Sequence, residues 1–352
     1  SSSAQPPGEP KRLERFDQSF DRPPAETDAA PVWYRHIEIA GLIEIEASTL
    51  SPYEGDSESD IVLATAELGL RSQVNDWVEA GIYFLYEQNA TDLEVDIAYL
   101  TLTNAEVSPL FLTAGQVYVP FGVYETNLVG EARETALQLG VEQRGFSGSL
   151  YVFNGDNNVK GRDRIEGWGA NLGFEQEHED WAWSVGVGYI NDLGDSDTLH
   201  ESINDSRVSA AEFAPNLSID STERIGGWTA NAAASLGPFS LIGEYLSATD
   251  DFDPVSLGFK DGGARPSAWN IEAGYSFPLL GRESVAAVAY QGTREALALE
   301  LPKERWLLGW SIEIFDRTSL GLEWARDRDY NTCDGGTGKS ADTITAQLAV
   351  EF

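Results

Sequence analysis

The chain ends on TITAQLAVEF, residues 343–352, in which apolar and wetter positions alternate up to the last residue. A period of two residues is typical of a β-strand with one apolar face and one polar face. The apolar, membrane-facing side of this closing strand is expected to carry Ile344, Ala346, Leu348, Val350 and Phe352. Such a strand at the end of a very acidic chain needs an apolar partner for its outer face.

The same alternation recurs in sixteen short segments between residues 36 and 352. In ERWLLGWSIEIF, residues 304–315, for example, Trp306, Leu308 and Trp310 share one face. No stretch approaches the roughly 18 apolar residues of a transmembrane helix. A crossing of a membrane by this chain therefore requires a closed β-barrel, in which every backbone polar group is paired.

The connections between these segments alternate in length. Minimal links such as Arg144-Gly145 follow long ones such as VPFGVYETNLVGEA, residues 119–132. Bacterial outer-membrane barrels combine short periplasmic turns, longer extracellular loops and an even number of strands. We therefore expect an all-β, transmembrane antiparallel barrel of about sixteen strands over residues 35–352. A flexible, Pro-rich tail over residues 1–34 and no folded plug domain are expected before it. A soluble, secreted acidic β-protein is the alternative.

The net charge of the chain limits which kinds of partner it can bind. The chain has 23 Lys and Arg against 58 Asp and Glu, a net charge of -35. Nucleic acid is excluded as a partner, because phosphate attraction needs clustered positive charge. The lack of Met and the Ser-Ser-Ser start indicate a mature chain whose signal peptide has been removed. We therefore expect the outer membrane of a Gram-negative bacterium, with its lipids and small solutes or cations as partners.

If the apolar faces contact lipid, the polar faces line a lumen that sixteen strands make wide enough for water. Carboxylates massed in such a tube attract cations and repel anions. Acidity as an adaptation to a saline habitat is the competing explanation. The lumen-lining residues expected from the clearest alternating runs are Glu38, Glu44, Glu67, Arg71, Glu79, Glu87, Glu94, Asp96, Gln116, Glu134, Gln138, Glu142, Arg144, Asn171, Asn231, Asn270, Glu272, Arg305, Glu313 and Glu323.

The connection over residues 120–133 is too apolar for a loop in water, so we expect it to fold inward and narrow the pore. A lid lying on the rim is the alternative. The constriction is expected to involve Phe121, Tyr124, Glu125, Asn127, Glu131 and Arg133.

Catalytic and metal sites are not expected. His36, His178 and His200 have no Ser or Cys nucleophile motif beside them. The alternating acids near Asp327 lack the bidentate Glu that completes a calcium loop. No cofactor is therefore expected, and the protein is predicted not to be an enzyme.

Several segments in order, including LTAGQVYVPFGVYETNLV (112–129), GPFSLIGEYLSATDDFD (237–253) and DGGTGKSADTITAQLAVEF (334–352), resemble the LbtU family of siderophore porins. The resemblance runs from about Glu38 to Phe352. It implies a sixteen-stranded outer-membrane barrel that admits an iron chelate without a plug domain. The residues themselves favour a passive, cation-preferring porin, and the resemblance adds siderophore uptake, with a ligand-specific ferric-siderophore receptor as the alternative. Sixteen-stranded porins are often trimers, so a homotrimer is one expected assembly.

Overall fold

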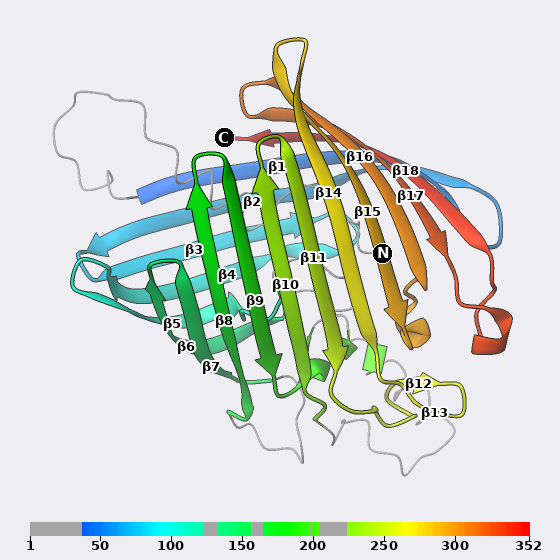
Figure 1. Cartoon of the computed structure of the whole chain (residues 1–352), viewed down its shortest axis with the longest axis horizontal. Helices are drawn as coiled ribbons and strands as arrows, with labels where there is room; N and C mark the ends of the chain where they lie inside the picture. Colours follow the sequence, from blue (N-terminus) through cyan, green and yellow to red (C-terminus); the bar gives the residue numbers. More distant parts are fainter. Residues whose placement is uncertain (1–36, 123–131, 156–164, 197–198, 201, 204–223) are drawn as a thin grey trace.

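The computed structural model describes residues 37–122, 132–155, 165–196, 199–200, 202–203 and 224–352. Over these residues the chain forms a closed antiparallel barrel in which each strand pairs with its neighbours and the first strand pairs with the last (Figure 1). The sixteen barrel strands are β1 (Ile37–Ser51), β2 (Glu58–Asn75), β3 (Val78–Glu87), β4 (Thr91–Asn104), β5 (Ser108–Tyr118), β6 (Arg133–Gln143), β7 (Phe146–Phe153), β8 (Gly167–His178), β9 (Trp181–Ile190), β10 (Gly227–Leu236), β11 (Phe239–Ala248), β14 (Ser267–Leu279), β15 (Arg282–Arg294), β16 (Glu304–Phe315), β17 (Thr318–Arg328) and β18 (Ser340–Glu351).

The prediction of an antiparallel barrel of about sixteen strands is confirmed. Strands β12 (Gly258–Phe259) and β13 (Gly262–Gly263) form a separate small hairpin in one connection, so β11 pairs directly with β14. Within the described part of the connections lie three single-turn 3₁₀ helices, η2 (Leu193–Asp195), η3 (Leu297–Leu299) and η4 (Thr332–Asp334). No helix among the described residues is long and apolar enough to cross a membrane. The predicted tail over residues 1–34 lies outside the described residues.

The two ends of the barrel differ in their connections, as the sequence predicted. At the end where the C-terminus lies, strands are joined by turns of two or three residues (Figure 1). In one of these turns Arg144 has φ 51° and Gly145 has φ 79°, the left-handed pair whose twist matches that of the flanking strands. Long connections, including the one that carries β12 and β13, lie at the opposite end. We call these the short-turn end and the loop end.

The outer surface of the barrel is apolar. Large side chains such as Ile39 (64% exposed), Leu150 (65%) and Ile344 (53%) lie on it without cover. Aromatic rings from adjacent strands also pair, including Trp228 with Tyr245, whose ring centroids are 5.2 Å apart. A continuous apolar exterior is unfavourable in water, whereas an outward apolar band with aromatic rings is the surface of a barrel in lipid.

Candidate functional site in the barrel interior

The inner wall carries carboxylates between the outward apolar residues. In β1, Glu44 is 4% exposed and lies between the outward-facing Ile43 and Ile45. Because strand residues alternate between faces, the ladder register follows the inner face from strand to strand. The predicted lumen residues that share this face are Glu38, Glu44, Glu67, Arg71, Glu79, Glu87, Glu94, Glu134, Gln138, Glu142, Asn171, Asn231, Asn270, Glu272, Arg305, Glu313 and Glu323.

Three predicted lumen residues lie outside this alternation: Asp96, which is the extra residue of a bulge in β4, Arg144 and Gln116. Arg144 lies in the turn between β6 and β7, because its left-handed backbone and Gly145 close the hairpin there. Gln116 pairs with Ala98 and Thr135 on the neighbouring strands. Two residues earlier in β5, Ala114 pairs with Leu100, whose side chain is exposed on the outer surface. By register Gln116 therefore belongs to the outer face, and its predicted place in the lumen is wrong.

The interior arginines of the described strands have carboxylate partners. Arg71 Nη2 lies 3.1 Å from Glu79 Oε2, and the same glutamate accepts a hydrogen bond of 2.9 Å from the Tyr99 hydroxyl. Arg305 contacts Asp327 with two nitrogens, at 2.5 and 2.7 Å. On the described inner face, carboxylates outnumber arginines.

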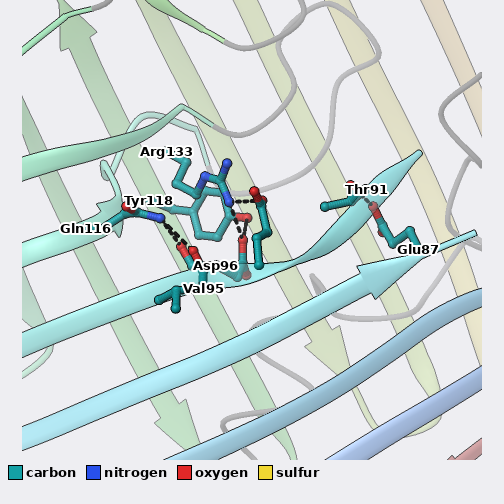
Figure 2. Close-up of polar contacts among 8 residues, drawn as sticks. Glu87, Thr91, Val95, Asp96, Gln116, Tyr118 and Arg133 are labelled. Carbon is teal, nitrogen blue, oxygen red and sulfur yellow. Dashed lines mark hydrogen bonds and ion pairs between the residues drawn. The ribbon is translucent and has the colours of Figure 1, made fainter. Parts of the chain in front are cut away.

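A bulge in β4 (Figure 2) ties down both ends of the connection over residues 119–132. The ladder shifts register between the β4 residues Val95 and Ile97, which leaves Asp96 as the extra residue, 1% exposed. Asp96 Oδ1 accepts a hydrogen bond of 2.6 Å from the Tyr118 hydroxyl and lies 3.3 Å from Arg133 Nη1. Tyr118 ends β5 and Arg133 begins β6, so one buried carboxylate holds both anchors.

Two further contacts complete this cluster. Arg133 also forms an ion pair with Glu94, and the Gln116 amide donates to the backbone carbonyls of Val95 at 2.8 Å and Asp96 at 2.9 Å. Arg133, predicted to lie in the constriction, is thus bound to the β4 wall.

The connection after β5 turns into the barrel. Phe121 is 8% exposed, and a Cβ atom on Gly227 of β10 would lie 3.1 Å from its ring. The next residue, Gly122, has φ 81° and lies beside the Glu244 carboxylate of β11. Because β6 to β9 separate β5 from β10, Phe121 must cross the interior to reach this wall. The other predicted constriction residues, Tyr124, Glu125, Asn127 and Glu131, lie outside the described residues.

The loop end contains an apolar cluster that sequence reasoning missed. Side chains of the long connections pack there against Phe121 and the inward-facing Tyr151 and Phe153. The buried contributors from these connections are Leu193, Leu199, Ile203, Ile225, Phe252, Leu257, Ala264, Ala296 and Leu299. They are scattered among polar residues, so no period marks them. Burial of these side chains holds the loops against one side of the interior.

An aspartate joins three of the connections at the same end. Asp334 Oδ1 lies 2.9 Å from Lys260 Nζ, and its Oδ2 lies 3.9 Å from Lys303 Nζ. The hydrogen bond from Lys260 holds the pKa of Asp334 below its usual value. Nearby, burial raises the pKa of Asp329, but hydrogen bonds from Thr337 and the Tyr330 amide outweigh it and leave that pKa lowered.

Comparison with known proteins identifies distant relatives and structures of the same fold. No protein-family model matches the chain. The chain is 28% identical over 343 residues to a UPF0422 protein of Coxiella burnetii, covering 89% of this chain and 71% of that protein. It is also 28% identical over 351 residues to the UPF0422 protein lpp3030 of Legionella pneumophila, covering 90% and 66%. The chain thus spans about two thirds of the length of these relatives.

Solved structures that resemble this chain include a porin and an outer-membrane channel. An anion-selective porin from Comamonas acidovorans has a TM-score of 0.58 and 14% identity, over 90% of this chain and 99% of that one. Pseudomonas putida OprB has a TM-score of 0.62 and 8% identity, over 90% and 94%. The DcaP channel of Acinetobacter baumannii has a TM-score of 0.56 and 12% identity, over 90% and 97%. At these identities the likeness shows that the chain has the fold of porins.

Proposed function

We propose that the protein is an outer-membrane porin of a Gram-negative bacterium that lets small solutes diffuse through an acidic, cation-preferring lumen. The inner-face carboxylates are the observation that carries this proposal. Glu44, Glu67, Glu272 and Glu323 face inward from both sides of the β1–β18 seam, and Arg71 and Arg305 each contact a carboxylate. Porins of this fold include an anion-selective one, so interior charge and not the fold sets the preferred sign.

The mechanism is diffusion along a charged wall past a narrowed section. Carboxylates in a confined space raise the local concentration of cations and lower that of anions. The inward turn at Phe121 and Gly122, anchored through Tyr118, Arg133 and Asp96, takes up part of the cross-section. This turn then limits the size of the solutes that can pass, and the charged wall selects among them by the sign of their charge. Neither step requires a catalytic group or a bound cofactor.

We include siderophore uptake in this proposal, chiefly for ferric chelates that are neutral or cationic. The resemblance to the LbtU family supports a ferric chelate as one solute, and the negative lumen favours a neutral or cationic chelate over an anionic one. The packed connections at the loop end, including Phe252 and Leu257, support the alternative of a specific receptor surface. Saturable binding of ferric chelates to the purified protein distinguishes such a receptor from a general pore.

The proposal is tested by reconstituting the purified chain in planar bilayers with a tenfold KCl gradient. A reversal potential of the sign that indicates K⁺ permeation supports it, and a potential of the opposite sign overturns the cation preference. A chain that stays in solution without detergent overturns the membrane location, leaving the secreted acidic protein. Chemical cross-linking of the detergent-purified chain tests the expected homotrimer.

A further inference from the structure

A recess lies against the inner wall of β7 to β10, beneath Pro120 and Gly122 of the inward turn. Its polar side chains include the neutral Ser147, Asn171 and Asn231, with Glu175 as its carboxylate. We call it the amide recess. Its wall is rich in amides and glycines, with Glu175 in it and Glu142 and Glu244 paired with its residues Ser147 and Asn231.

Glycines on neighbouring strands shape the recess. A Cβ atom on Gly186 would lie 2.8 to 3.2 Å from the amide atoms of Asn231, and one on Gly173 would lie 2.6 Å from Ser147 Oγ. The polar side chains therefore lie flat over glycine backbone instead of projecting into the lumen. A larger residue at either glycine would push them away from the wall.

The amides of the recess have hydrogen-bonding capacity to spare. Asn171 Oδ1 accepts a hydrogen bond of 2.6 Å from Ser149, and within the described residues its Nδ2 has no partner. Asn231 forms no side-chain hydrogen bond with the residues that the structure describes, although it faces Gly186. An amide offers two donor hydrogens and an acceptor oxygen, whereas an ionised carboxylate only accepts.

We propose that the amide recess is a binding subsite for uncharged, hydroxyl-rich solutes of the sugar class. Adjacent hydroxyl groups both donate and accept, which matches paired amides and a serine better than it matches carboxylates. A sugar also has no charge for the acidic wall to attract or repel. The inference rests on the proposed pore and names a class of solute for it.

The test uses maltotriose as the probe and a poly(ethylene glycol) dimethyl ether of similar size as its control, because this methyl-capped polyether accepts hydrogen bonds along its length but has no hydroxyl group to donate them. In planar bilayers we expect maltotriose to reduce the ionic current saturably and the polyether not to do so. Asn231→Ala should weaken the maltotriose effect about fivefold, the value of one ordinary hydrogen bond. Asn270→Ala is the matched control, since Asn270 faces the lumen from β14 outside the recess.

A second measurement does not depend on conduction. Saturation-transfer NMR on the detergent-solubilised barrel reports maltotriose binding directly, and Asn231→Ala should reduce the signal while Asn270→Ala leaves it unchanged. The proposed subsite is overturned if both variants bind maltotriose equally well, or if the polyether has the same effect as maltotriose. A folded barrel that binds maltotriose but carries no current overturns the porin proposal and leaves the subsite in place.

Discussion

The aromatic ring of Phe352 lies over Gly41 at the seam where the barrel closes. A Cβ atom on Gly41 would be 2.3 Å from the ring's Cζ. The two residues also exchange both backbone hydrogen bonds, with N to O distances of 2.8 and 3.0 Å. The last residue of the chain is thus paired with the first strand, and the absence of a side chain at residue 41 makes room for its ring.

Substitution of this glycine should weaken the closure. Gly41→Val forces the Phe352 ring off its site, and because this ring is exposed and can move aside, the cost is about 1 kcal/mol, the low end of the range for overpacking. We expect a lower urea midpoint of unfolding for the barrel in detergent micelles. Gly262→Ala is the control, because nothing lies within 4 Å of a Cβ atom placed there. Equal midpoints for Gly41→Val and the unaltered protein would show that the ring contact adds nothing.

Neutralising inner-face carboxylates should reduce cation preference. The double substitution Glu272→Gln and Glu323→Gln removes two inward charges with almost no change of shape. We expect the cation-to-anion permeability ratio, measured from reversal potentials, to fall about twofold as the field weakens. Glu106→Gln removes the same charge from an exposed residue of the turn between β4 and β5 and should leave the ratio unchanged. A ratio that falls equally in both cases would point to overall charge instead of the lumen wall.

Shortening Phe121 should widen the path. Phe121→Ala removes the ring that reaches Gly188 and Gly227 across the interior. We expect a higher single-channel conductance and passage of larger uncharged solutes in a liposome-swelling assay. Phe146→Ala, which removes an exposed ring of β7 at the short-turn end, should leave conductance unchanged. An unaltered conductance in Phe121→Ala would place the narrowest section elsewhere.

The loops tied by Asp334 should loosen in acid. The pKa of Asp334 is held below its usual value of 3.8 by the hydrogen bond from Lys260. The ion pair therefore stabilises the loops above that value, and the contribution is lost as the pH falls through the lowered folded pKa. Hydrogen exchange of residues 258–263 should accelerate below about pH 4, beyond the intrinsic change in exchange rate.

The variant Asp334→Asn separates this ion pair from its surroundings. It should show fast exchange of the same residues already at neutral pH and little further opening in acid. Part of the acid effect should remain in residues 329–339, because the pKa of Asp329 is also lowered by its hydrogen bonds to Thr337. Asp316→Asn, in the turn at the opposite end, is the control. Protection that is independent of pH in the unaltered protein would refute the role of Asp334.

Most of the barrel could be predicted from the chain because its physical cause is local. Alternation with a period of two identifies strands, and the lengths of the connections identify the two ends. The predicted lumen positions were wrong at two residues, where the two-residue period of the strand is interrupted. At Gln116 the neighbouring Gly115 has φ 148°, and at Arg144 a two-residue turn replaces the strand. Asp96 owes its burial and its partners Tyr118 and Arg133 to a bulge in β4. No residue type in this segment predicts that bulge.

The sequence by itself determined the strands, their inward and outward faces, the alternating connections and the apolar closing strand, since each depends on residues close together in the chain. Only the tertiary structure decided that Phe121 reaches β10, that scattered apolar residues of four connections pack together, and that Phe352 covers Gly41. These contacts join segments far apart in the chain. Their geometry depends on the curvature and register of the whole barrel, which no local pattern contains.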